Sequence, residues 1–351
     1  MKIYAYILII LFGVLTAQCE KEILEENQDI PSSDKENEDY NSYWYYSYEA
    51  THLVNAETLD RETPEEFVPY TVAHRGDSLF IANTGKAGYS LLVYSIGQGK
   101  LLNTLKSWQI AGEEKSFGSR IEAIVPAGDR LYVTERDSRI HVFSLPELAY
   151  LTCIGNGSWA GPVFQAQAMT VKDGLIYARD KTGMVSIYKE AEATPENYQK
   201  VNRYCQASGN GSLGNNGFEA HYMQPDAEGH ILLTDYLGKK IRVLDPSLVN
   251  DELTNKISID LDDLALSLEF NPRTFALCNE RWYVTGNNNA INIYDREQDK
   301  WVKAMKSVKG YTFSQPVRVY AQNDTTLWIS DINNSKRTLV KVSVHKGEIR
   351  E

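Results

Sequence analysis

The chain has 351 residues, of which 42% are hydrophobic and 24% are charged, and its formal net charge is −11. This composition is typical of a globular protein with an ample core, and a closed β architecture of this length is routinely one domain. The negative charge argues against nucleic acid as a partner and against binding to an anionic membrane surface, because both would repel the chain.

The first 19 residues have the features of a secretory signal peptide. Lys2 gives a positive start, residues 3–14 are almost continuously apolar, and Cys19 follows shortly after. Such a run is short for a membrane span and fits the apolar region of a signal peptide. The position of Cys19 resembles the lipobox of bacterial lipoproteins, which implies cleavage before this cysteine and its acylation, although Gln18 stands where a small residue is usual. The alternative is an uncleaved N-terminal anchor.

Residues 20–42 are predicted to form a disordered acidic tether. They are rich in charged and polar residues and cannot bury enough apolar surface to offset the entropy of ordering. The stretch Glu20-Lys21-Glu22 resembles the export signal of surface lipoproteins in the Bacteroidota. This resemblance implies an outer-membrane lipoprotein that is exposed on the cell surface and touches the membrane only through its lipid. The periplasmic face is the alternative.

Residues 43–351 are predicted to fold as one repeat domain. Six times, a β-rich run is followed by a short polar turn and a second β-rich run. The second runs end 52, 45, 55, 51 and 45 positions apart, at Asn83, Glu135, Asp180, Asp235, Gly286 and Asp331. A period of this size, with three or four strands in each unit, is typical of a propeller. The sequence therefore predicts an all-β fold, a six-bladed β-propeller.

One repeat resembles a known propeller family. Residues 77–85 read Asp-Ser-Leu-Phe-Ile-Ala-Asn-Thr-Gly and are similar to the NHL stretch that ends its second strand in Ala-Asp-Thr-Gly. The whole layout, over about residues 45–345, resembles the NHL and TolB-like six-bladed propellers. This resemblance implies the architecture but no single activity, because the fold hosts binders, lyases, lactonases and scaffolds.

The last repeat lacks an outer strand, since only residues 346–351 follow its third predicted strand. Residues 43–48, Tyr-Trp-Tyr-Tyr-Ser-Tyr, precede the first repeat and are suited to supply this strand from the other end of the chain. Such closure would remove an open sheet edge. We therefore expect the aromatic cluster to close the ring; a carbohydrate-stacking platform is the alternative.

Aligning the six first strands predicts a ring of side chains at one mouth of the central channel. Its members are Tyr70, Glu122, Gln167, Glu219 (or Tyr222, if the register is shifted), Arg273 and Arg318. The two arginines could hold a carboxylate or sulfate in bidentate fashion, so the ring is the predicted ligand-binding site. The alternative is that its members pair with one another around a water-filled pore.

No cofactor or metal is expected. Cys153, Cys205 and Cys278 occur singly, which indicates neither a zinc site nor a thiol nucleophile, and His74 is predicted at the end of the channel opposite the ring.

Two long inserts, which carry Trp108 and Trp159, are expected to add to the rim of the channel mouth. The loop 207–218 is rich in glycine and asparagine but lacks the lysine of a phosphate-binding loop.

These features predict a surface-tethered lipoprotein that binds an extracellular ligand, first of all a glycan, at the channel mouth. One alternative is an enzyme, a polysaccharide lyase or lactonase, that uses Glu122 or Glu219 in the same ring. Another is a scaffold that docks onto a protein partner in an outer-membrane complex. No catalytic residue is assigned.

Overall fold

The computed structural model describes residues 42–86, 88–137, 139–155, 157, 163, 165–179, 185–190, 205–209, 220–248, 258–333 and 335–350. The predicted signal peptide, Cys19 and almost all of the predicted tether lie outside these residues, as do Glu219 and Trp159. In the described part, no helix is long and apolar enough to span a bilayer.

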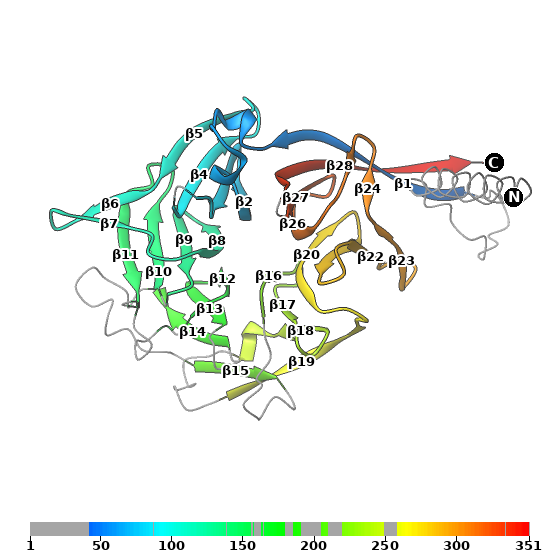
Figure 1. Ribbon diagram of the computed structural model, residues 1–351. Coiled ribbons are helices and arrows are strands. Elements are labelled where there is room, and N and C mark those ends of the chain that lie inside the picture. The colour runs from blue at the N-terminus through cyan, green and yellow to red at the C-terminus, as the bar shows by residue number, and fades with distance from the viewer. Residues whose placement is uncertain are drawn as a thin grey trace, which may run out of the picture.

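Six four-stranded blades surround a central axis, which confirms the predicted six-bladed β-propeller (Figure 1). The first strand of each repeat lies nearest the axis. Blade 1 comprises β2 (Pro69–Arg75), β3 (Ser78–Asn83), β4 (Ser90–Ser95) and β5 (Lys100–Leu105). Blade 2 comprises β8 (Ile121–Ala127), β9 (Arg130–Glu135), β10 (Arg139–Ser144) and β11 (Tyr150–Ile154). Blade 3 comprises β12 (Ala168–Lys172), β13 (Leu175–Arg179), β14 (Val185–Lys189) and β15 (Cys205–Gly209).

The second half of the ring repeats this arrangement. Blade 4 comprises β16 (Met223–Pro225), β17 (Ile231–Asp235), β18 (Lys240–Leu244) and β19 (Ser258–Ser267). Blade 5 comprises β20 (Pro272–Cys278), β21 (Arg281–Gly286), β22 (Ile291–Asp295) and β23 (Lys300–Met305). Blade 6 comprises β26 (Pro316–Asn323), β27 (Thr326–Ile332), β28 (Arg337–Arg350) and β1 (Ser42–Val54).

Shorter elements connect the blades or lie between them. They are the hairpin β6 (Ser107–Ile110)–β7 (Glu113–Ser116), the hairpin β24 (Ser307–Val308)–β25 (Tyr311–Thr312), and the 3-10 helices η1 (Glu57–Leu59), η2 (Pro64–Glu66) and η5 (Pro246–Leu248). In addition, β15 pairs in parallel with β19, which joins the outer edges of blades 3 and 4. Each of these two strands thereby covers an edge that would otherwise be open.

The ring is closed by a strand from the N-terminal side, as predicted. β1 pairs antiparallel with β28 along its whole length, from Ser42 opposite Arg350 to Val54 opposite Leu339. Tyr46 and Tyr48 of this strand are buried against blade 5, where the Tyr48 hydroxyl accepts a hydrogen bond from Arg281 Nη1 (3.0 Å). The aromatic cluster is therefore largely part of the core, although the Trp44 and Tyr45 side chains are exposed.

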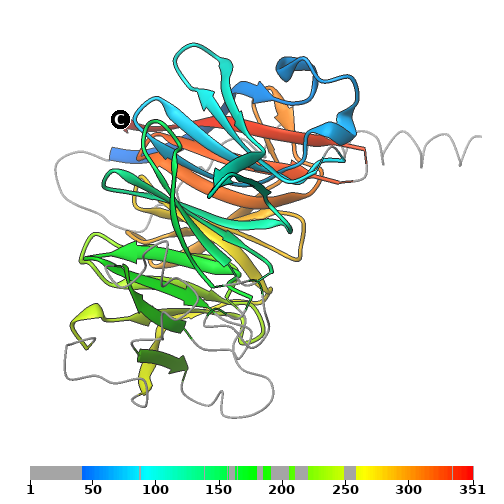
Figure 2. The ribbon, with the colours of Figure 1, turned by 90° about the vertical axis from the view of Figure 1, so that its left-hand side faces the viewer.

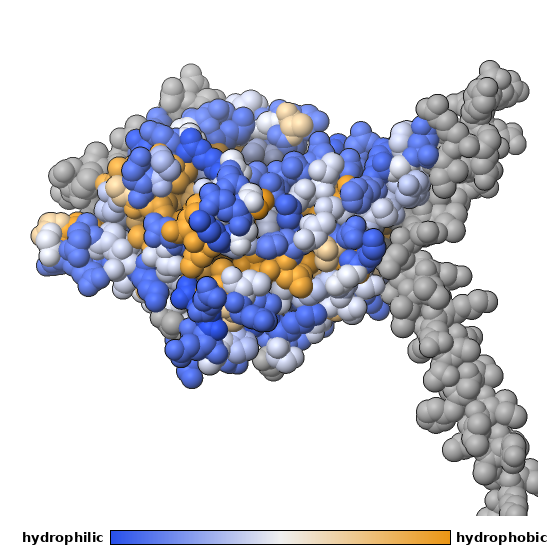
Figure 3. Space-filling model, turned by 90° about the horizontal axis from the view of Figure 1, so that it is seen from above, coloured by the Kyte–Doolittle hydropathy of each residue, from blue (hydrophilic) through white to orange (hydrophobic). Residues whose placement is uncertain are grey.

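Apolar side chains fill the spaces between neighbouring blades. One cluster joins Phe80 and Leu91 of blade 1 to Ile124 and Leu131 of blade 2. The middle strands have neighbours on both faces, and every residue of β4 is buried; continuous apolar runs of this kind are typical of fully buried strands. Figure 2 shows the blades from the side, and in Figure 3 hydrophilic residues cover most of the surface around a narrower apolar band.

The polar residues that end the second strands anchor the segments leading into the blades. Asn83 Oδ1 accepts a hydrogen bond from Val68 N (2.8 Å), and Glu135 Oε1 accepts one from Ser119 N (2.9 Å). Asp331 accepts from the backbone N–H groups of both Ser314 and Gln315. The recurring polar end of the repeat is thus a buried acceptor for backbone N–H groups, which is a structural role.

Cys153 and Cys278 are buried thiols, and they should be inert in the folded protein. Burial raises the pKa of Cys153 and of Cys278 to about 12. In a chain with serine at positions 19 and 205, we expect both remaining thiols to react with a thiol reagent at pH 8 at least about a hundredfold more slowly than free cysteine. Full reactivity should return in guanidinium. Rapid labelling of the folded chain would contradict this.

Candidate functional site

The central channel has two chemically different ends. At the start of the inner strands lies a depression of about 520 Å³, which we call the polar mouth; it is lined by Val68, Tyr70, Thr84, Arg120, His221, Tyr236, Arg273, Val317, Arg318 and Ile332. At the other end lies a chamber of about 440 Å³ with a mostly aliphatic and aromatic wall. Three members of the predicted ring, Tyr70, Arg273 and Arg318, line the polar mouth.

A β-bulge at the start of the inner strand places the ring residues. Pro69 pairs with Asn83 but Thr71 pairs with Ala82, so Tyr70 is the extra residue. The same shift makes Glu122 of blade 2 and Arg273 of blade 5 the extra residues. Bulges re-aim side chains, and here they occur at equivalent points of several blades.

Threonines near the ends of the second strands hold these irregular segments. Thr134 Oγ1 accepts a hydrogen bond from Ala123 N (2.9 Å), next to the bulge of blade 2. Thr234 Oγ1 accepts from His221 N (3.1 Å) and donates to the Arg273 carbonyl of the next blade (3.4 Å). The ring backbone is therefore bonded both within and between blades.

Two of the predicted ring positions are wrong in register. In blade 4, Thr234 N donates to Tyr222 O, so the residue equivalent to Tyr70 is His221, neither Glu219 nor Tyr222. In blade 6, Pro316 pairs with Asp331 and Arg318 with Ser330, so Val317 occupies the equivalent position. In blade 6 a second bulge, between Ala321 and Asn323, adds one residue to the inner strand, and in blade 4 the turn between Pro225 and Ile231 is longer than in blade 1, so an alignment based on the second strands slips in these two blades.

Arg318, one residue deeper than the ring, crosses the channel. Its Nη1 donates to the carbonyl of His221 in blade 4 (3.0 Å), and its Nη2 lies 3.8 Å from Glu122 Oε2 of blade 2. Its guanidinium carbon is 4.4 Å from the ring centroid of Tyr70 in blade 1. The Arg318 side chain is only 7% exposed, so it serves as an internal brace between three other blades.

Glu122 is engaged by two arginines. Its Oε1 accepts from Arg120 Nε (3.0 Å) and Nη2 (2.6 Å), while its Oε2 faces Arg318. The Glu122 side chain is 2% exposed, so it lies beneath the surface of the mouth. The contact between Glu122 and Arg318 is of the kind that the alternative interpretation, pairing among ring members, describes, but the main partner of Glu122 is Arg120, which was not a predicted ring member.

The remaining predicted residues also have defined surroundings. The guanidinium carbons of Arg120 and Arg318 lie 4.1 Å and 4.4 Å, respectively, from the ring centroid of Tyr70. The Tyr70 ring therefore helps to position both arginine side chains. Gln167 precedes β12, and its Oε1 accepts a hydrogen bond from Arg179 Nη1 (2.7 Å).

Arg273 and Tyr236 differ from these braced residues because they present accessible groups at the mouth. Arg273 is partly exposed, and within the described part of the chain its guanidinium makes no hydrogen bond or ion pair. Tyr236 is partly exposed, and its ring meets that of His221 edge-on with centroids 5.1 Å apart. Sequence reasoning missed Tyr236, although it directly follows the second strand β17, whose end must lie beside the start of the inner strand.

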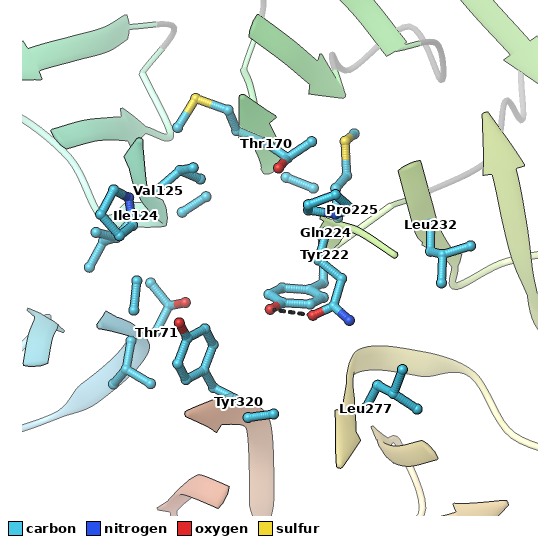
Figure 4. A pocket seen from close by; sticks show the side chains of 18 of the residues that line it. Thr71, Ile124, Val125, Thr170, Tyr222, Gln224, Pro225, Leu232, Leu277 and Tyr320 are labelled. Atoms are coloured by element: carbon cyan, nitrogen blue, oxygen red, sulfur yellow. Dashed lines mark hydrogen bonds between the residues drawn. The ribbon is translucent and has the colours of Figure 1, made fainter. Parts of the chain in front are cut away.

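The opposite chamber is lined by Tyr222 and Tyr320, and also by His74, which the sequence predicts at this end of the channel. Figure 4 shows Tyr222 and Tyr320 pointing into it, with the Tyr222 hydroxyl donating to Gln224 Oε1 (3.1 Å). The Tyr320 hydroxyl is 2.7 Å from His74 Nδ1, and burial lowers the pKa of His74. The hydroxyl groups of both tyrosines are thus already engaged by neighbouring side chains.

Two other candidate features have structural explanations. Trp108 does not extend the rim: it is buried among Phe117, Phe143 and Tyr150 on the outer side of blade 2. In the turn between β16 and β17, ligand atoms of Asp226, Glu228 and His230 lie within 4.8 Å of one another. Asp226 Oδ1 accepts from His230 N (2.7 Å), a contact that fixes the turn without an ion.

The fold and the channel define the class of this protein, a six-bladed β-propeller with a polar mouth. Solved structures with the same fold include the propeller domain of Cps50 (Swd1) from Myceliophteria thermophila, with 10% identity and a TM-score of 0.55 over 85% of this chain and 100% of that one. A protein of unknown function from Bacteroides thetaiotaomicron has 12% identity and a TM-score of 0.56 over 87% of this chain and 77% of the other. U3-55K has 10% identity and a TM-score of 0.51 over 81% and 78%, respectively.

Such low identities show the fold alone, and this fold is compatible with a ligand-binding or a scaffold role. No protein-family model matches the chain, and no curated protein matches its sequence. The finer resemblance to the NHL and TolB-like families therefore stays a prediction.

Proposed function

We propose that this protein is a surface-tethered lipoprotein that binds an extracellular glycan at the polar mouth of its propeller. The observation that carries the proposal is the combination of a 520 Å³ depression with accessible aromatic and cationic groups from different blades. Ligand sites of this size use a few placed polar groups to fix orientation. Sugars suit such a site because tyrosine rings stack on their apolar faces while polar groups bind their hydroxyls.

Tyr236 is the aromatic group of the polar mouth that supports this proposal. Tyr236 is anchored by its backbone, since its carbonyl accepts a hydrogen bond from Asn271 Nδ2 (2.7 Å). Tyr70, whose ring already contacts two guanidinium groups, is assigned a positioning role.

The proposed ligand contacts do not include Glu122. This carboxylate is buried and shared by Arg120 and Arg318, so it is not arranged as an accessible general base. The proposed surface location and the lipid on Cys19 rest on the N-terminal sequence alone.

A glycan array probed with the purified full chain tests the proposal. We expect binding to at least one glycan class, and we expect Tyr236→Ala to weaken it about tenfold, the effect of losing roughly 1.4 kcal/mol of stacking. Tyr45→Ala, which removes an exposed ring on β1, is the matched control and should bind like the parent chain. Failure of neutral, uronic and sulfated glycans alike to bind would refute the proposal, and co-purification with a membrane protein would then favour the scaffold role.

A further inference from the structure

The positive charges of the polar mouth are not balanced by its own acidic groups. Arg120, Arg273 and Arg318 line the depression, whereas none of its described lining residues is acidic. Glu122 lies beneath and is one carboxylate shared between two of these arginines. The protein as a whole carries a net charge of −11, so this excess of positive charge is local.

We infer that the polar mouth is an anion site that takes a carboxylate or a sulfate group, with Arg273 as the principal contact. The inference deepens the proposed function and rests on it, because it specifies an acidic glycan. Arg273 is the arginine whose guanidinium has no bonded partner among the described residues. A guanidinium fork matches the geometry of both oxyanions and forms paired, charge-assisted hydrogen bonds with them.

The backbone and the neighbours of Arg273 prepare it for this role. Its carbonyl accepts the Thr234 hydroxyl of blade 4, which ties the bulge of blade 5 to the adjacent blade. The side chain is only partly exposed, so a bound anion would be screened less by salt than on an open surface. The site is therefore held in place before the ligand arrives.

Arg120 supplies a second donor to the same depression. Its Nε and Nη2 donate to Glu122, whereas its Nη1 has no hydrogen-bond acceptor in the described part of the chain, and its side chain is 31% exposed. Cation–π contact with Tyr70 and the ion pair with Glu122 fix its orientation. Arg318, in contrast, is buried and committed to its brace, so we assign it the role of a positioning residue.

Calorimetric titration of the full chain tests the inference. The probes are glucuronate, glucose 6-sulfate, glucose and inorganic sulfate, all at one ionic strength set with sodium chloride. We expect the two acidic sugars to bind at least about tenfold more tightly than glucose, because a charge-assisted hydrogen bond contributes more than 1.4 kcal/mol. Arg273→Gln should lower the affinity for both acidic sugars at least about tenfold, to the level of glucose, and Arg273→Lys should keep part of the preference.

The matched control is Arg296→Gln, which removes an exposed arginine of blade 5 outside the channel and should leave all affinities unchanged. Urea midpoints equal to that of the parent chain will show that each variant is folded. Equal affinity for glucose and glucuronate, or full anion affinity in Arg273→Gln, would overturn the anion site while the glycan proposal stands. Binding of inorganic sulfate that depends on Arg273, without binding of any sugar, would support the anion site and refute the glycan proposal. Binding of none of the four probes would overturn the inference.

Discussion

Replacing Arg281 with methionine should lower the free energy of unfolding by about 3–5 kcal/mol, because it removes one partner of a buried ion pair. Arg281 Nε and Nη2 both donate to Asp295 Oδ2, and the two side chains are 4% and 5% exposed. Arg281 Nη1 also binds the Tyr48 hydroxyl, and its guanidinium carbon lies 3.4 Å from the Tyr46 ring centroid. The variant therefore loosens the closing strand β1 and leaves a carboxylate buried without its cation.

Urea unfolding followed by tryptophan fluorescence measures this effect. The double variant Arg281→Met/Asp295→Asn should recover at least about 1 kcal/mol, since it removes the unpaired buried charge. Arg296→Met, at an exposed position in the same blade, is the control and should lie within about 0.5 kcal/mol of the parent chain. A loss below 1 kcal/mol in Arg281→Met would show that this cluster does not secure the ring.

We expect Asp331→Ala to cost about 3 kcal/mol, because it removes a buried carboxylate that accepts three hydrogen bonds. Asp331 Oδ1 accepts from Gln315 N (2.6 Å) and Ser314 N (3.0 Å), and Oδ2 accepts from the Tyr311 hydroxyl (2.9 Å). These bonds attach the segment before β26 to the end of β27. Asp331→Asn keeps one acceptor oxygen and should cost less.

The same unfolding measurement, with Asp129→Ala as the control, tests this expectation. Asp129 lies in the exposed turn between β8 and β9, where its side chain is 88% exposed. Its removal should change stability by no more than about 0.5 kcal/mol. If Asp331→Ala and Asp129→Ala have equal effects, the polar ends of the second strands do not anchor the blades.

Much of the fold could be predicted because its signals are local. The second strands are buried on both faces, so they read as apolar runs, and their polar ends recur since each accepts backbone donors. Ring closure was also predictable, because a missing strand at one end and an aromatic strand at the other leave few alternatives. Trp108 was misread because a tryptophan in a long insert looks the same in the sequence whether it is buried or exposed.

The candidate site was predictable only in part. Tyr70 and Arg273 occupy the expected positions at the mouth, but blade 4 contributes His221 in place of Glu219 or Tyr222, and blade 6 has Val317 at the position expected for Arg318. Arg120 was missed because it precedes its strand, and its importance comes from the contact with Glu122. Tyr236 could have been found, because the ends of second strands must lie beside the starts of their inner strands.

The sequence by itself determined the number of blades, the order of their strands and the closure of the ring, since burial imposes a residue pattern on every strand. Only the tertiary structure decided which side chains face the ligand. One bulge moves Val317 into the place expected for Arg318, and the long Arg318 side chain then reaches Glu122 and His221 in other blades. These contacts across the channel depend on how the blades are arranged in space. No residue pattern along the chain records this arrangement. It is this arrangement that leaves Arg273 accessible at the mouth while its neighbours are engaged.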